Sequence, residues 1–393
     1  MRASVVFGVI CAGCSDPRVV LGVNTIDATT DAATDADAAT DAATDAGVAT
    51  DAATDADAAT DAATDADAAT DATTGAGVLN CSTSGPGRSD CGADSESCCT
   101  SLEVPAGTYY RTFTNSGAGP TAEADPATVS GFRLDKYLVT VGRFRSFVAA
   151  WNGGAGWVPA AGSGRHAHLN GGRGLVIGGV PGTYEPGWIA SDDANVAPTD
   201  ANLACVGSLA PDLAPGSTYG TWTPSAAGQE NLPITCVNWY EAYAFCIFDG
   251  GFLPSEAELE YASVGGSAQR EYPWGTTDPG RSYQYAVYGC YYPSISGSCT
   301  GVANIGPVGT AALGSGLWGQ LDLAGNVWEW TLDWHASYVD PCLDCANLTA
   351  GSMRSTQGGN FNTGTTAFPP FRGQDNPSDP GPYAYGIRCA RSP

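Results

Sequence analysis

The sequence predicts an α+β domain with much irregular structure, preceded by a disordered spacer. Three observations lead to this class: a long segment made almost wholly of Asp, Ala and Thr, a high content of Gly and Pro (52 and 25 of 393 residues), and helical periodicity in only three short stretches. Gly and Pro interrupt regular structure, so a domain rich in both contains many loops.

Residues 1–14 have the features of a secretion signal. Arg2 precedes an apolar run from Ser4 to Gly13 that is too short to span a membrane. The end of this run is similar to a bacterial lipobox, in which Cys14 would be lipidated, except that Cys11 stands where Leu is usual. We therefore expect an exported protein, either an outer-surface lipoprotein that meets the membrane only through its lipid anchor or a secreted protein; a misplaced start codon is the alternative.

A solvated spacer is expected over residues 15–80. Asp27 to Asp71 follows a ten-residue period, as in DAATDADAAT, with 13 Asp and no aromatic, Lys or Arg residue. Such a segment buries too little apolar surface to offset the entropy of ordering it, and its like charges repel. A β-solenoid would need an apolar inward position, and these repeats offer little beyond Ala. The acidic balance, a formal net charge of −25, argues against nucleic acid as a partner.

The cysteine content agrees with export. Two of the 14 cysteines lie in the signal region, and the other 12 are an even number, as six disulfides require. A zinc site at the single CxxC motif would need a second pair or added His, so disulfides are favoured. Proximity in sequence suggests the pairs Cys205–Cys236, Cys290–Cys299 and Cys342–Cys345. The pairing of four further cysteines stays open: Cys81, Cys91, Cys98 and Cys99.

Regular elements are few after residue 80. Residues 81–100 are small, polar and rich in Cys, which predicts a disulfide-stapled leader before a compact domain that begins near Ser101. A first helix is predicted over 140–151, where four apolar residues share one face: Phe144, Phe147, Val148 and Trp151. Strand-like segments are shorter and cover 131–137, 326–330 and 385–390.

Two further helices are predicted from capping boxes. Asn238 and Glu241 stand three residues apart before an apolar run, and Ser255 and Glu258 repeat the pattern. Each helix is expected to stop at the Gly-Gly pair that follows it.

Seven short blocks follow one another in order along residues 101–393. They are Phe132–Thr140, Leu232–Trp239, Phe252–Ala262, Tyr272–Gly275, Gly325–Thr331, Gly358–Phe361 and Gly386–Arg391. Together they resemble the formylglycine-generating enzyme (sulfatase-modifying factor) family. The resemblance implies a divergent C-type-lectin-like fold for residues 101–393.

The resemblance also implies a copper site, which the residues do not support. The founding enzymes of the family hold Cu(I) with two cysteine thiolates and oxidise a sulfatase cysteine to formylglycine. Counting from Gly359, the two cysteine positions fall on Thr363 and Phe368, and neither side chain is a ligand for Cu(I). No cysteine lies between Cys345 and Cys389, so a small shift in register does not restore the site. We expect neither copper nor a catalytic residue of this kind.

Other catalytic chemistries find little support. The ergothioneine-type branch of the family uses iron held by three His, largely from an added helical domain that this chain lacks. The three His here are His166, His168 and His335. His166 and His168 alternate along the chain and are able to share a metal, or they are two exposed loop residues that bind nothing. No G-x-S-x-G elbow supports a serine nucleophile.

Two structural features are implied by the resemblance. One is a disulfide between Cys246 and Cys389; a second family disulfide has lost both partners, at Ser263 and about Gly373. The other is a calcium site with side-chain oxygens at its first and last positions and carbonyls between them. Its residues here are Asp322, Gly325, Val327 and Glu329, and Asn304 marks a weaker second site. The alternative is that Asp322 and Glu329 meet solvent or a basic neighbour.

Three functions remain open. The missing thiolates and the long spacer favour a non-catalytic surface module that binds a glycan, a peptide or a protein. An oxidoreductase of the same family with a different site, and a structural envelope protein without a ligand, are the alternatives. Fold alone does not decide among them, because function depends on the residues of the site.

Overall fold

The computed structural model describes residues 81–393 except 82, 206–218, 350 and 379–382. Contacts divide the chain into Met1–Ala69 and Thr70–Pro393, and all described residues belong to the second unit. The predicted signal peptide, Cys14 and the spacer lie outside the described residues. Within the described part, no helix is long and apolar enough to cross a membrane.

The three predicted helices are present, and both predicted capping boxes are formed. Helix α1 (Val141–Trp151) begins at Thr140, whose side chain accepts a hydrogen bond from the backbone N–H of Arg143. Helices α3 (Trp239–Phe248) and α4 (Glu256–Ser263) each begin with a complete capping box. The short helix α2 (Asp200–Leu203) was not expected.

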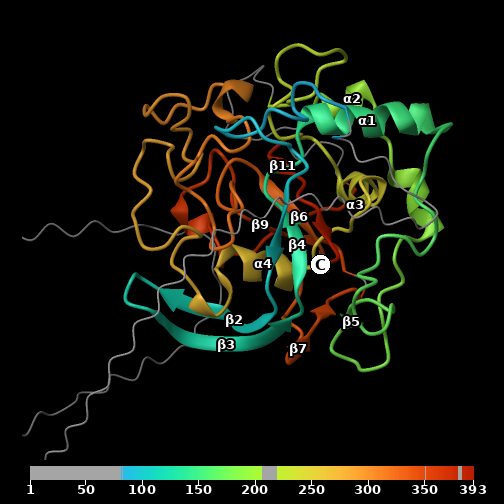
Figure 1. The fold of residues 1–393 in the computed structure, drawn as a ribbon, viewed down its shortest axis with the longest axis vertical. Coiled ribbons are helices and arrows are strands. Elements are labelled where there is room, and N and C mark those ends of the chain that lie inside the picture. Colours follow the sequence, from blue (N-terminus) through green and yellow to red (C-terminus); the bar gives the residue numbers. More distant parts are fainter. Residues whose placement is uncertain (1–80, 82, 206–218, 350, 379–382) are drawn as a thin grey trace, which may run out of the picture. The chain divides into compact units, whose positions relative to one another are not determined.

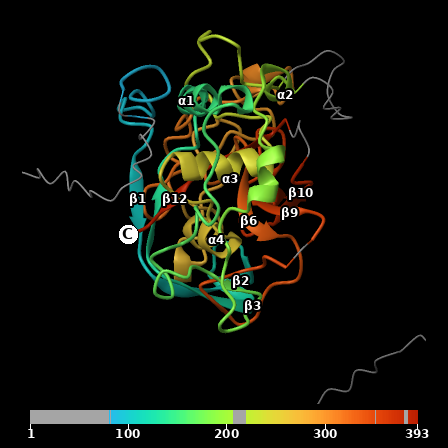
Figure 2. The ribbon, with the colours of Figure 1, turned by 90° about the vertical axis from the view of Figure 1, so that its right-hand side faces the viewer.

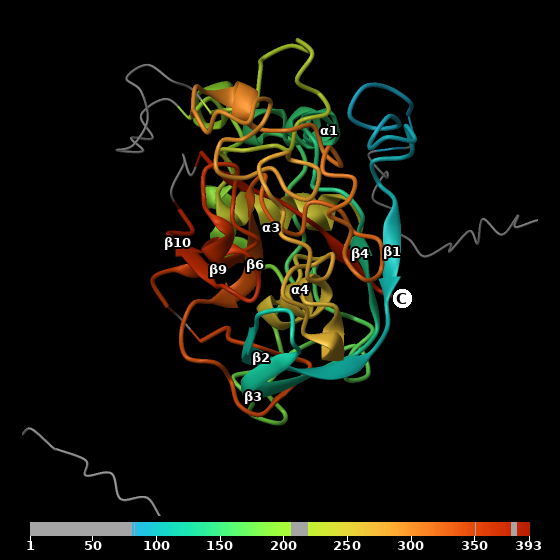
Figure 3. The ribbon, with the colours of Figure 1, turned by 90° about the vertical axis from the view of Figure 1, so that its left-hand side faces the viewer.

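Helices α1 and α3 pack together through aromatic side chains. Phe144 and Phe147 of α1 contact Phe245 of α3, with ring centroids 5.5 and 5.9 Å apart. These three rings are fully buried in one hydrophobic cluster, whereas Val148 and Trp151 pack against its edge. Figures 2 and 3 show α1, α3 and α4 arranged one below another, with the β2–β3 hairpin beyond α4.

Strands in the described part form small sheets. In order along the chain, the strands are β1 (Ser101–Val104), β2 (Gly107–Asn115), β3 (Pro120–Val129), β4 (Phe132–Asp135), β5 (Val176–Ile177), β6 (Trp328–Trp334), β7 (Cys342–Leu343), β8 (Cys345–Ala346), β9 (Arg354–Gln357), β10 (Gly373–Asp375), β11 (Tyr385–Gly386) and β12 (Ala390–Arg391). The sheets have the orders β1-β4-β12, β10-β9-β6-β11, β2-β3-β7 and β5-β8. The first sheet joins β1, near the start of the described residues, to β12, near their end. Figure 1 labels its middle strand, β4, and Figure 2 labels β1 and β12.

The predicted strands are present with different bounds. Segments 131–137 and 326–330 correspond to β4 and β6, but 385–390 divides into β11 and β12, which belong to different sheets. The antiparallel β2–β3 hairpin was missed, although it is the longest pairing described. Its inward side chains on β2 are Tyr109, Arg111 and Phe113.

The Cys-rich leader packs on the domain, which corrects the expectation that it stands apart from the core. Its disulfides are Cys81–Cys99 and Cys91–Cys98. Cys91 and Cys98 are buried in a cluster with Tyr137 of the domain. The folded unit therefore begins before Ser101.

The remaining disulfides are the three pairs expected from proximity in sequence and the pair implied by the family resemblance. They are Cys205–Cys236, Cys246–Cys389, Cys290–Cys299 and Cys342–Cys345. Cys246 lies in α3 and Cys389 directly precedes β12, so this bond ties the central helix to the end of the chain across 143 residues.

Candidate functional site

The segment after β9 brings together the two positions where the family motif has its thiolates. Gly358 and Gly359 have φ angles of 98° and 72°, which reverse the chain. A Cβ atom on Gly359 would lie 3.1 Å from Oγ1 of Thr363 and 3.3 Å from Cδ1 of Phe368. Thr363 and Phe368 are therefore neighbours around one backbone position, as two ligands of one metal must be.

The hydroxyl of Thr363 is engaged by the backbone. It accepts a hydrogen bond from the N–H of Asn360 at 2.9 Å and donates one to the carbonyl oxygen of Asn360 at 3.0 Å. The side-chain oxygen of Asn360 in turn accepts from the N–H of Thr363. The role of Thr363 is to close this turn.

Phe368 is buried among aromatic rings. Its centroid lies 5.4 Å from that of Tyr288, 6.2 Å from Trp274 and 6.4 Å from Tyr272. A ring in such a cluster stabilises the fold by burial and edge-to-face contact, and it offers no lone pair to a metal. Every cysteine from residue 81 onwards is in a disulfide, so no neighbouring thiolate replaces it.

A groove of about 420 Å³ lies beside Phe368. Its lining comes from β2 and from the segments around Tyr338 and Phe371: Arg111, Thr112, Phe113, Tyr338, Thr366, Phe368, Pro370, Phe371 and Arg372. The guanidinium carbons of Arg111 and Arg372 lie 4.4 and 4.0 Å from the centroid of the Tyr338 ring. The groove thus combines aromatic walls with two cations.

The two arginines are held in different ways. Arg372 forms a two-point ion pair with Glu256, with Nη2 2.7 Å from Oε2. Arg111 donates to the carbonyl oxygens of Asp125 and Val339, and no ion pair to a described carboxylate is present. Arg111 was missed in the sequence because its hairpin was not predicted. The alternation of Tyr109, Arg111 and Phe113 was the available indication.

Glu329, a predicted calcium ligand, is paired with Arg388. Oε2 and Oε1 of Glu329 accept from Nε and Nη2 of Arg388 at 2.8 and 2.9 Å, and both side chains are buried. Arg388 also donates to the carbonyl oxygens of Asp135, Lys136 and Leu321. The alternative expected for Glu329, contact with a basic side chain, is therefore observed.

Asp322, the first predicted calcium ligand, keeps one oxygen without a partner. Oδ2 of Asp322 accepts from the N–H of Gly309 at 2.6 Å, but Oδ1 is buried without a partner among the described residues. Burial raises the pKa of Asp322 to about 6. The carbonyl oxygen of Val327 and Oε1 of Glu329 lie 3.8 and 4.0 Å from the place of a Cβ on Gly358. Such hard oxygen donors fit Ca²⁺.

Asn304 closes a loop. Its side-chain oxygen accepts from the N–H of Thr300 at 2.7 Å, and its amide donates to the carbonyl oxygens of Tyr292 and Ser298. Both polar atoms of its side chain therefore have protein partners.

His166 and His168 do not form a common site. Nδ1 of His166 lies 2.9 Å from Oε1 of Glu185, and Nε2 lies 3.0 Å from Oε2 of Glu258. His166 is fully buried, so the expectation of an exposed loop residue is wrong for it. His168 is partly buried, and its ring stacks on Phe252. No cluster of three or more His, Cys, Asp or Glu side chains that could hold a metal occurs among the described residues.

The pair of carboxylates sets the charge of His166. Burial by itself lowers the pKa of an imidazole, but Glu258 and Glu185 outweigh it and raise the pKa of His166 to about 10. At neutral pH this histidine is an imidazolium between two buried carboxylates, which is a structural ion cluster linking the 166–185 loop to α4.

A family model and several known proteins match this chain. Residues 88–393 match the sulfatase-modifying factor enzyme 1-like domain. A formylglycine-generating enzyme of Thermomonospora curvata is 29% identical over 279 residues, which cover 66% of this chain and 82% of that protein. The mouse protein named inactive C-alpha-formylglycine-generating enzyme 2 is 32% identical over 167 residues, 41% of this chain and about half (49%) of its own length. The solved structure of PvdO from Pseudomonas aeruginosa, at 20% identity, covers 79% of this chain and 100% of that one with a TM-score of 0.48.

Proposed function

The chain belongs to the sulfatase-modifying factor enzyme 1-like family, and from this premise we propose that it is an exported binding module that does not oxidise cysteine to formylglycine. One observation carries the proposal: the neighbouring positions around Gly359 hold Thr363 and Phe368, while the cysteines from residue 81 onwards are all in disulfides. A relative named inactive is a further indication that this fold persists without the reaction.

The groove beside Phe368 supports a peptide as the ligand. Phe113, Phe368 and Phe371 offer apolar contacts to side chains. Arg111, which has no ion pair to a described carboxylate, offers a charged donor to a peptide carboxylate, whereas Arg372 is already paired with Glu256. Aromatic and Arg residues dominate binding energy at protein surfaces. Phe371 is 49% exposed, so a bound peptide would bury a large apolar area there.

Selection from a random peptide library displayed on phage tests this role. We expect selected peptides to bind the purified domain and to lose about tenfold or more in affinity when Phe371→Asp places a negative charge on the groove wall. Leu313→Asp is the matched control, since Leu313 is similarly exposed (52%) but does not line the groove. Failure to enrich any peptide, or equal binding by both variants, contradicts a peptide-binding groove.

We propose further that Asp322, Gly325, Val327 and Glu329 hold Ca²⁺, the first and last through side-chain oxygens and the two between through carbonyls. The support is the unpartnered Oδ1 of Asp322 together with the carbonyl oxygen of Val327 and Oε1 of Glu329, which lie 3.8 and 4.0 Å from the place of a Cβ on Gly358. The role of the ion would be structural, because these residues lie within and beside the turn that enters β6.

Removal of calcium is expected to lower the melting temperature of the wild-type domain. At a hundredfold excess over Kd a bound ion stabilises by about 2.7 kcal/mol. At about 2–4 °C per kcal/mol for a large domain, this corresponds to a shift of roughly 5–10 °C in the melting temperature. Asp322→Asn keeps the shape and removes the charge, so EGTA should shift this variant little, whereas the exposed control Asp94→Asn should behave as wild type. Melting curves that coincide with and without EGTA at matched ionic strength would remove the site and leave Arg388 as the sole partner of Glu329.

Export and lipidation at Cys14 rest on the sequence of residues 1–14. A lipid at Cys14 and the acidic spacer after it would hold the folded part away from an outer surface. Mass spectrometry of the mature N-terminus distinguishes a lipidated Cys14 from a secreted form and from an intact Met1.

A further inference from the structure

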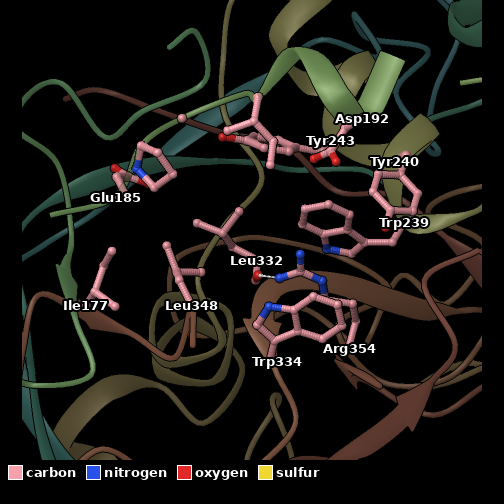
Figure 4. Close-up of a pocket in the computed structure, with 13 residues that line it drawn as sticks. Ile177, Glu185, Asp192, Trp239, Tyr240, Tyr243, Leu332, Trp334, Leu348 and Arg354 are labelled. Carbon is pink, nitrogen blue, oxygen red and sulfur yellow. Dashed lines mark hydrogen bonds between the residues drawn. The ribbon is translucent and has the colours of Figure 1, made fainter. Parts of the chain in front are cut away.

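A second cavity, of about 330 Å³, shares no lining residue with the groove beside Phe368. It lies between the start of α3, the ends of β6 and β9, and the loop that follows β5 (Figure 4). Pockets for small ligands have volumes of about 300–1,000 Å³ with a mostly apolar lining and a few polar groups. The volume and the mostly apolar lining of this cavity fall within that description.

Its most unusual feature is Arg354, which stacks between two indole rings. The guanidinium carbon lies 3.5 Å from the ring centroid of Trp239 and 3.6 Å from that of Trp334. Figure 4 shows the guanidinium between these rings at one side of the cavity. Arg354 is only 7% exposed, so the rings fix its position and remove most of its hydration.

Arg354 has no ion-pair partner among the described carboxylates. Nη1 donates to the carbonyl oxygen of Leu332 at 2.6 Å, but Nε has no partner and no ion pair is present among the described residues. Burial lowers the pKa of Arg354 to about 9. A buried cation without a paired carboxylate is costly, and stacking on rings offsets only part of that cost.

None of the acidic side chains described around the cavity forms an ion pair with Arg354. Both oxygens of Asp333 accept backbone hydrogen bonds, from Glu256 and Asn347. Glu185 is committed to His166. Asp192 lines the cavity, and burial raises its pKa while the charge of Arg354 lowers it by a smaller amount. The two side chains attract each other but form no ion pair.

The rest of the lining is apolar and includes Ile177, Ile189, Tyr243 and Leu348. We propose that this cavity binds an organic carboxylate with an apolar or aromatic body, whose carboxylate pairs with Arg354. An arginine fork donates to both oxygens of a carboxylate, and such charge-assisted bonds strengthen at a site shielded from water. The carboxylate comes either from a free small acid or from the C-terminus of a peptide.

The test compares acids with their amides, using the intrinsic fluorescence of Trp239 and Trp334 and calorimetry as readouts. The probes are 3-phenylpropionate, 3-phenylpropanamide, N-acetyl-Gly-Phe and its C-terminal amide. We expect at least one acid to bind about tenfold or more tightly than its amide. Binding of both acids indicates a site for small acids, and binding of the peptide acid alone indicates a site for a peptide terminus. Equal affinity for acids and amides, or no binding at millimolar concentration, overturns the proposal.

Arg354→Met removes the charge while its thioether still fits between the indole rings, so it should abolish the preference for acids. The control is Arg173→Met, because Arg173 also stacks on a ring, that of Tyr184, but is exposed and outside the cavity. If Arg354→Met does not fold, Leu348→Trp is the second test variant. It fills the cavity and keeps Arg354, so it should block binding of the acids. Retention of the acid preference in a folded Arg354→Met, or unchanged affinity in Leu348→Trp, contradicts the assignment.

Discussion

His166→Leu is expected to destabilise the domain by about 3–5 kcal/mol, because it leaves two buried carboxylates without their cation. In the wild type, Glu185 and Glu258 occupy the two ring nitrogens of His166, and all three side chains are buried. Chemical denaturation at pH 7 measures the free energy of unfolding. His168→Leu is the matched control, since His168 is only partly buried and forms no ion pair.

The same cluster predicts a pH dependence. The folded pKa of about 10 for His166 lies above the ordinary value of 6.5, so the folded protein binds the proton more tightly than the unfolded chain. Its contribution is fully present below pH 6.5 and is lost as the pH rises through 10. The difference in stability between wild type and His166→Leu should therefore shrink over this range.

Two results would contradict this account of the cluster: a loss in His166→Leu no larger than in His168→Leu, or a difference that stays constant from pH 6 to 10. Adding Glu185→Gln and Glu258→Gln to His166→Leu should recover part of the lost stability, because neutral amides are less costly to bury than unpaired carboxylates.

Local sequence signals predicted the helices well. Asn238 with Glu241, and Ser255 with Glu258, each form the reciprocal hydrogen bonds that their spacing indicates. These signals work because a capping box involves residues three apart, whatever the surrounding fold. The strands depend on partners far along the chain, so the division of 385–390 between two sheets was not visible in sequence.

In the candidate site, too, contacts between residues close in sequence were predictable and contacts between distant residues were not. Counting from Gly359 placed Thr363 and Phe368 together because a tight turn fixes the geometry of so short a segment. The groove beside them also takes its wall from Arg111 on β2, which lies more than two hundred residues away in sequence. Glu258 reaches His166 from 92 residues away. Such contacts exist only after the chain has folded.

The second large effect concerns catalysis: a peptide with the sulfatase Cys-x-Pro-x-Arg motif should yield no aldehyde above a copper-only blank. The family reaction needs two soft thiolates to hold Cu(I), and the hydroxyl of Thr363 and the ring of Phe368 supply neither. The protein supplies binding and orientation, whereas the oxidation belongs to the metal. Mass spectrometry of the peptide after incubation with copper and O₂ is the readout. Turnover above the blank would show that another site in the chain activates O₂.

Titration of Cu(I) against a competing chelator tests the central claim most directly, because it does not depend on choosing the right substrate. Ascorbate keeps copper reduced without opening the disulfides, so the thiol content stays that of the folded protein. The account predicts that residues 81–393 bind no Cu(I) in competition, and that Thr363→Cys with Phe368→Cys creates a site for one equivalent. One tightly bound equivalent in the wild-type domain would contradict the claim that the family's copper site has been lost.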